Sequence, residues 1–212
     1  MKGKAMGRFD LGAISEHRRT AEPMQANFPE LSEMAHVIAA EFGVEVSSRV
    51  AVLDESFAVV IGRVDGPEII HFESNLARQE LPHCSALGKV LLSHLSEQQV
   101  RAIVDRTGLP ARTAATITDV ESLLRELEGA RARGFAVDDE EDCEGVFCVA
   151  APVFGRRGAC VAAISVTGLK LSLPVGDIEE MGQIVRRYAA EISGKMGGAG
   201  ADAATPKPIG RP

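Results

Sequence analysis

The sequence predicts an α+β protein, in which an antiparallel sheet packs against flanking helices. Two observations predict this class. Short β-branched segments fall into two groups of three, and their connections are too short for parallel crossovers. Helical patterns precede, separate and follow these groups. The predicted order is therefore helix, three strands, three helices, three strands, helix.

The first half of the chain is predicted as a helix and an antiparallel meander. The helix begins at Pro29, a favoured first helical position, and ends at Gly43. Its apolar face repeats at helical spacing. That face consists of Leu31, Met34, Ala35, Ile38 and Phe42. Strands over Val44–Leu53, Phe57–Val64 and Glu68–Glu73 follow, separated by turn residues.

Three helices are predicted in the middle of the chain. The first runs from about Ser85 through Leu92, and the next two begin with capping-box patterns. The capping pairs are Ser96 with Gln99 and Thr118 with Glu121. Gly134 ends the third helix, since glycine is the usual residue just past a helix end.

The last third is predicted as three strands and a long helix. The strands cover Phe135–Val137, Gly145–Phe154 and Cys160–Thr167, and the turn at 156–158 joins the last two. The helix over Val175–Met196 has an apolar face of Ile178, Met181, Val185, Tyr188 and Ile192. The domain plan is a linker over residues 1–28, one folded domain over residues 29–196, and a disordered tail over residues 197–212.

Composition excludes several classes of protein. The 212 residues suit one domain with short attachments, and 45% are hydrophobic, enough for a sizeable core. No apolar run is long enough to span a bilayer, and no signal peptide is evident, so we expect a cytoplasmic protein with no membrane partner. The net charge of −7 argues against nucleic-acid binding by the chain as a whole. The four cysteines are expected to be reduced thiols.

Four places have residues suited to chemistry. The helix start at Cys84–Gly88 offers backbone N–H groups to an anion, although many helices begin with serine. The acidic run Asp138–Asp142 reads mostly as a solvated loop, with one carboxylate free to turn inward. Cys148 is a candidate nucleophile, but a buried apolar role is the simpler interpretation. Ser165 and Thr167 share one strand face, where backbone groups, water or a ligand would satisfy them.

Catalytic and cofactor motifs are missing from the sequence. It contains no Walker loop, nucleophile elbow, HExxH motif or dinucleotide fingerprint. The histidines have no metal-ligand spacing, and none lies near Cys148 in sequence. We therefore expect no enzyme activity, no cofactor and no metal.

Four segments in register resemble a known family. They are Leu81–Leu92, Arg133–Glu141, Gly145–Val153 and Ala162–Gly168. Together with the helices between them, they closely resemble the effector-binding domain of the isocitrate-lyase-regulator (IclR) family of bacterial transcription regulators. The likeness covers roughly residues 28 to 197. It implies a GAF-like fold that binds small acids such as glyoxylate, pyruvate or aromatic carboxylates.

The resemblance also implies a set of pocket residues. The backbone at Ser85, Ala86 and Leu87 would hold the effector carboxylate, and Ser165 and Thr167 would donate hydrogen bonds. The remaining positions implied to line the pocket are Asp138, Cys148, Phe72, Leu81 and Val146. A pocket aspartate would repel a carboxylate unless it accepts a hydrogen bond from the ligand or from the backbone. This favours a hydroxylated or hydrated acid.

The chain departs from the family pattern at its beginning. Members usually carry a winged helix-turn-helix of about 75 residues before this domain, whereas residues 1–28 resemble only the end of the wing and the linker. We therefore expect a shortened regulator or a stand-alone sensor, forming a homodimer or homotetramer and binding DNA only where a winged helix-turn-helix is present. Leu87 stands where some members have a smaller residue, which would narrow the pocket.

Two alternatives remain open at this point. Beside the acid-sensing domain, the first alternative is a protein-interaction module that sequesters full-length relatives. The second is an enzyme that uses Cys148 with Asp138 on a small carbonyl acid.

Overall fold

One antiparallel sheet organises the molecule. The computed structural model describes residues 29–44, 46–64, 79–172 and 177–198. Within these ranges six strands form a sheet in the order β3-β2-β1-β6-β5-β4, and each neighbouring pair is antiparallel. The strands are β1 (Val46–Asp54), β2 (Phe57–Val64), β3 (Gln79–Glu80), β4 (Ala136–Asp139), β5 (Val146–Phe154) and β6 (Cys160–Leu169). The strand predicted over Glu68–Glu73 lies outside the described residues.

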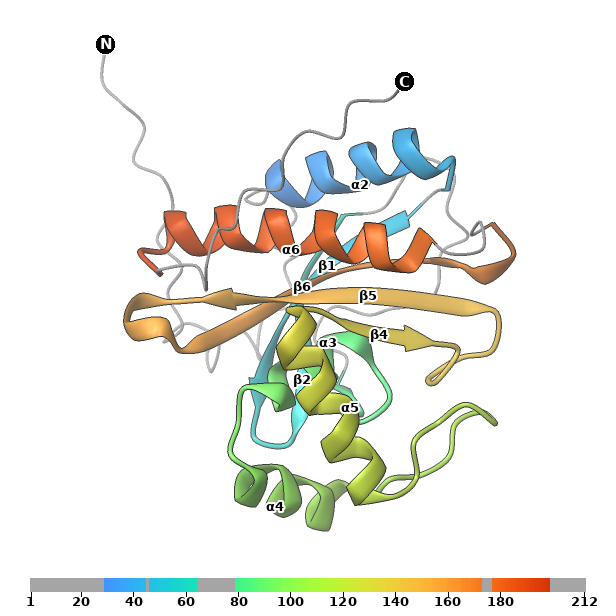
Figure 1. Ribbon diagram of the computed structural model, residues 1–212, viewed down its shortest axis with the longest axis vertical. Coiled ribbons are helices and arrows are strands. Elements are labelled where there is room, and N and C mark those ends of the chain that lie inside the picture. The colour runs from blue at the N-terminus through green and yellow to red at the C-terminus, as the bar shows by residue number, and fades with distance from the viewer. Residues whose placement is uncertain (1–28, 45, 65–78, 173–176, 199–212) are drawn as a thin grey trace.

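Helices cover both faces of the sheet. They are α2 (Pro29–Phe42), α3 (Ala86–Ser93), α4 (Glu97–Thr107), α5 (Val120–Arg133) and α6 (Asp177–Lys195). Figure 1 shows α2 and α6 together on one side of the sheet, and α3, α4 and α5 on the other. The α+β class predicted from the sequence is confirmed.

The sheet consists of two meanders joined at its centre. Strands β1 to β3 form one, and β4 to β6 form the other. Strand β1 pairs with β6, so that Arg49 lies opposite Ser165 and Ser47 opposite Thr167. Segments more than 100 residues apart in sequence therefore lie side by side at the middle of the sheet (Figure 1).

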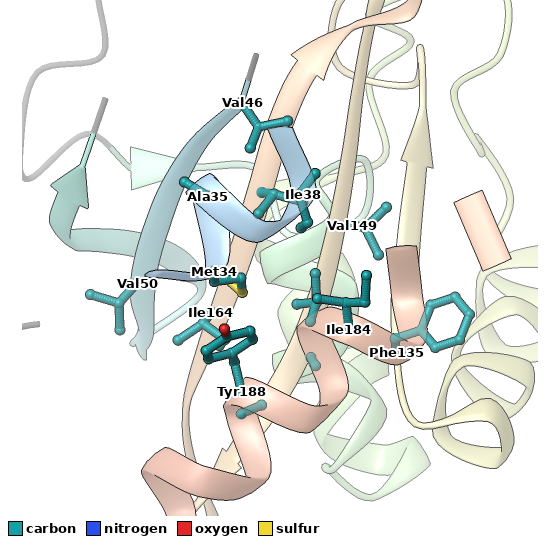
Figure 2. Close-up of a cluster of buried hydrophobic side chains, with 14 of the residues drawn as sticks. Met34, Ala35, Ile38, Val46, Val50, Phe135, Val149, Ile164, Ile184 and Tyr188 are labelled. Carbon is teal, nitrogen blue, oxygen red and sulfur yellow. The ribbon is translucent and has the colours of Figure 1, made fainter. Parts of the chain in front are cut away.

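The main core lies between the sheet and the helices α2 and α6. Figure 2 shows Met34 and Ile38 of α2, Ile164 of β6, and Ile184 and Tyr188 of α6 meeting in one cluster. These side chains follow the helical and alternating patterns of the sequence, which place apolar residues on one face of each element. A smaller cluster, built largely of alanine and valine, lies under α3 on the opposite face.

Local signals at helix ends proved mostly correct. Ser96 and Gln99 form the predicted capping box, and Gly134 ends α5 in the left-handed conformation. The capping pair of Thr118 with Glu121 was wrong. Asp119 caps α5 instead, because its carboxylate accepts a hydrogen bond from the backbone of Ser122 at 2.8 Å.

The two ends of the chain lie partly outside the described residues. The linker predicted over residues 1–28 is not described, and the predicted tail is described only at Gly197 and Gly198. In the part of the chain that the structure describes, none of the helices is long and apolar enough to cross a membrane.

Candidate functional site

A polar cavity of about 170 Å³ lies on the sheet face that α3 covers. Its walls come from strands of both meanders, from the start of α3 and from the loop over residues 140–145 between β4 and β5, here called the acidic loop. The lining residues are Ser47, Arg49, Arg63, Glu80, Ser85, Arg112, Asp138, Asp142, Cys143, Val146, Cys148 and Thr167. An apolar cavity of about 150 Å³ is enough to bind benzene, so this space suits a comparably small molecule.

Strand register places polar side chains in one row across the sheet. Asp138 of β4 pairs with Cys148 of β5, which pairs with Thr167 of β6, which pairs with Ser47 of β1. Because directly paired residues share a sheet face, all four side chains lie on the same side. Four strands thus form one polar wall of the cavity.

The neighbouring row of the same face is built differently. Ala136, Ala150, Ser165 and Arg49 are paired across the same four strands. The alanines are small, and Ser165 is fully buried with no hydrogen-bond partner for its hydroxyl among the described residues. The long Arg49 side chain is therefore the main polar group that this row presents.

Arg49 is a largely buried cation at the centre of the site. Its Nη1 donates to Glu80 Oε1 at 2.7 Å, and its Nη2 donates to Thr167 Oγ1 at 2.6 Å and to Cys148 Sγ at 3.3 Å. Burial acts to lower the pKa of Arg49, but the facing carboxylates, Glu80 first, leave that pKa above its ordinary value. The guanidinium is thus charged at every physiological pH.

The start of α3 faces the same cavity. Ser85 is the N-cap residue, and its hydroxyl accepts a hydrogen bond from the backbone of Gly88 at 3.1 Å. A helix N-terminus carries unpaired N–H groups and a partial positive charge. The helix therefore adds a second electropositive feature to a site that already contains Arg49.

Gly88 is required by packing within the protein rather than by contact with a ligand. A Cβ at this position would lie 2.3 Å from Pro82 Cα and 2.6 Å from the Pro82 carbonyl oxygen. The sequence pattern of small residues at the helix start therefore has a packing cause, which is the close approach of α3 to the preceding turn.

Asp138 is the buried carboxylate of the acidic run. Its Oδ1 accepts hydrogen bonds from the backbone N–H groups of Glu141 at 2.8 Å and Asp142 at 3.3 Å. Burial raises the pKa of Asp138 to about 7, and the nearby Glu141 adds to the rise. The carboxyl group is therefore close to half protonated at neutral pH.

A buried lysine holds the acidic loop in place. Lys89 of α3 is only 1% exposed and forms ion pairs with Glu141 and, at 3.8 Å, with Glu126 of α5. The hydroxyl of Thr116 also donates to the Glu141 carbonyl at 2.7 Å. These contacts fix the loop that follows β4 and presents Asp142 to the cavity.

Cys148 is the buried thiol of the cavity wall. Burial raises the pKa of the Cys148 thiol well above its usual range. A nucleophilic cysteine needs the thiolate form, which a raised pKa suppresses. The geometry therefore gives no support to Cys148 as a catalytic nucleophile.

The positions implied by the resemblance divide into three groups. Ser85, Asp138, Val146, Cys148 and Thr167 line the cavity. Leu81, Ala86, Leu87 and Ser165 are not among the lining residues, although Ala86 and Leu87 form the first turn of α3 and Ser165 lies beneath Arg49 on the same face. Phe72 lies outside the described residues.

Several lining residues were missed by the sequence analysis. Arg49 left one signal, because it is a lone charge within the otherwise small and apolar strand segment Val46–Leu53. Glu80 and Arg112 gave no signal in the sequence, since each lies in a polar stretch where charged residues are common. Only the fold brings them to the cavity.

An antiparallel sheet with a small polar cavity between its strands and a covering helix defines a small-molecule-binding domain. Comparison with known proteins assigns the family. The family model described as "Bacterial transcriptional regulator IclR C-terminal" matches residues 31–194. The chain belongs to this family, and it is the C-terminal ligand-binding domain of a transcriptional regulator.

Individual relatives agree with this assignment. The HTH-type transcriptional repressor AllR of Escherichia coli K12 is 31% identical over 192 residues, a match that covers 91% of this chain and 68% of that protein. The crystal structure of Thermotoga maritima IclR has a TM-score of 0.71 at 29% identity, covering 88% of this chain and 72% of that one. The inducer-binding domain of a double mutant of PobR from Acinetobacter, solved with 3-hydroxybenzoic acid, has a TM-score of 0.66 at 25% identity, covering 76% and 94%.

Proposed function

We propose that this domain senses a small organic acid, which binds in the cavity between Arg49, the start of α3 and the acidic loop. The observation that carries the proposal is the largely buried, permanently charged Arg49 in the wall of a cavity of about 170 Å³. Charge-assisted hydrogen bonds from a guanidinium suit a carboxylate. The complex of PobR with an aromatic acid, on a related domain, supports the same class of ligand.

The proposed contacts follow from the lining. The ligand carboxylate lies near Arg49 and the helix N-terminus at Ser85, and Thr167 supplies a hydroxyl beside it. Ser165 lies next to Arg49 on the same sheet face and would add a second hydroxyl if the ligand reaches it. Asp138, with a pKa of about 7, is able to hold a proton and so to accept an anionic neighbour. Val146 and Cys148 give the apolar part of the wall.

The proposed output is a change in quaternary structure. Regulators of this family bind small-molecule effectors, oligomerise and bind DNA. An effector shifts an equilibrium between two assemblies only by its difference in affinity for them. We propose a homodimer or homotetramer of this domain whose equilibrium the acid shifts, acting in the cytoplasm on DNA through a helix-turn-helix like that named in AllR.

Calorimetric titration of the chain with glyoxylate, pyruvate, lactate and 3-hydroxybenzoate tests the proposal. At least one acid should bind, its neutral amide should not, and Arg49→Met should weaken binding by tenfold or more while the circular dichroism spectrum is retained. Sedimentation velocity with and without that acid should show a shift between assemblies. If well-folded protein gives no heat with any acid, the proposal is wrong.

A further inference from the structure

The ion pair between Arg49 and Glu80 crosses the sheet inside the cavity. Arg49 lies on β1 and Glu80 on β3, with β2 between these strands. Both residues line the cavity, and neither charge lies in open solvent, since their side chains are 12% and 7% exposed. Glu80 therefore offsets part of the charge that Arg49 brings to the site.

The hydrogen bonding of this pair is incomplete. A guanidinium has five N–H donors. In the described residues, Arg49 uses Nη1 toward Glu80 and Nη2 toward Thr167 and Cys148, while its buried Nε has no partner. Glu80 accepts from Arg49 through Oε1, but its buried Oε2 has no partner either. Arg49 therefore has an unused donor and Glu80 has an unused acceptor, and both residues line the same cavity.

A buried polar group without a partner is costly. A ligand in the cavity is therefore favoured if the side chains of Arg49 and Glu80 turn these two atoms toward it and complete their hydrogen bonds. A carboxylate offers acceptors to Arg49 but nothing to Glu80, whose own carboxylate repels it. An acid with a hydroxyl or N–H group next to its carboxylate satisfies both residues at once.

We infer that Arg49 and Glu80 together determine specificity, selecting acids that carry an O–H or N–H donor beside the carboxylate over acids that lack one. This inference rests on the proposed acid-sensing function. A hydrogen bond to a charged group is among the stronger ones in proteins. We expect a preference of about tenfold for the donor-bearing acid.

Acids that differ by one group test the inference. Lactate, propionate and pyruvate share a three-carbon skeleton and carry, respectively, a hydroxyl donor, no polar group and a carbonyl acceptor at the second carbon. Calorimetry should give lactate a dissociation constant about tenfold lower than those of propionate and pyruvate. Glycolate against acetate repeats the comparison in a smaller ligand.

The variant Glu80→Gln tests the residue itself. If the amide oxygen keeps the bond to Arg49, the amide nitrogen takes the place of Oε2 and offers a donor instead of an acceptor. The preference should then reverse toward pyruvate. Glu97→Gln, which removes the same charge from the exposed start of α4, should leave the wild-type order unchanged.

The possible results distinguish a failure of the specificity role from a failure of the proposed acid-sensing function. Acids that bind the wild-type protein with equal affinity, with or without the hydroxyl, overturn the specificity role and leave the sensor role intact. Absence of binding by every acid overturns the sensor role. If Glu80→Gln does not fold, the wild-type comparison of lactate with propionate still decides the question.

Discussion

At the scale of single residues, burial controls the protonation of Asp138. Its pKa of about 7 in the folded protein compares with an ordinary value of 3.8. Between these values the folded state holds a proton that the unfolded state has released, so stability falls as pH rises from about 4 to about 7. One unit of pKa shift corresponds to about 1.4 kcal/mol, which makes the total effect a few kcal/mol.

Asp138→Asn should remove this dependence. Asparagine keeps an oxygen to accept from the backbone of Glu141 but carries no charge. Urea denaturation should show the variant more stable than wild type at pH 8, by about 3 kcal/mol, and nearly equal to it at pH 4. Asp105→Asn, on the exposed face of α4, is the control. A variant that is less stable than wild type at pH 8 would contradict the assignment.

Ser165 offers a second residue-scale prediction. Because its buried hydroxyl lacks a partner without a ligand, Ser165→Ala should leave the free energy of unfolding unchanged or slightly higher. If the ligand reaches this hydroxyl, acid affinity should fall by about 1 kcal/mol, the value of one net hydrogen bond. Calorimetry and denaturation on the same preparation measure both quantities. Unchanged affinity would remove Ser165 from the proposed site.

At the scale of elements, α3 depends on its contact with the turn at Pro82. Gly88→Ala forces a Cβ into the Pro82 backbone, which cannot rotate aside as a side chain would. We expect a loss of about 2–3 kcal/mol in the free energy of unfolding, in the range of overpacked core substitutions. Thermal or urea denaturation gives the value.

The matched control is Gly194→Ala, near the end of α6. A Cβ there meets nothing within 4 Å, and alanine is the better helix former. This variant should be neutral or more stable by up to about 1 kcal/mol. Equal losses at both positions would mean that glycine itself, rather than the Pro82 contact, explains Gly88.

Elements were also the level at which sequence reasoning succeeded. The α+β class, the positions of the five described helices and the shared face of Ser165 and Thr167 follow from periodicity, which is a local property. The two-residue strand β3 is too short to show a period, and it was not predicted. Which strands pair is not a local property, so no pattern in the sequence indicates that Arg49 lies beside Ser165 or that Glu80 reaches across β2. The cavity depends on those pairings, which is why Arg49 and Glu80 were missed.

At the scale of the whole molecule, the two faces of the sheet have different roles. The face covered by α2 and α6 contains the main apolar core, and the face under α3 contains the cavity. A core substitution on the first face should therefore lower stability without changing the site. This separation gives the last prediction.

Met181→Ala tests it, because Met181 is fully buried in α6 on the core face. The lost side chain and the remaining cavity should cost about 2–5 kcal/mol of stability. At a temperature where the variant stays folded, its acid affinity by calorimetry should equal that of wild type. The exposed neighbour Glu180 is the control position, where alanine should change neither quantity. A large loss of affinity in Met181→Ala would show that the two faces are coupled.

The joining of β1 to β6 also has a consequence during synthesis of the chain. Strand β1 is made early, yet its second neighbour, β6, ends only at Leu169. While the ribosome makes the intervening segment, one edge of β1 stays open, and an open edge is a template for pairing with another nascent chain. Charged side chains disfavour such pairing, and Arg49 lies within the stretch of β1 that later pairs with β6.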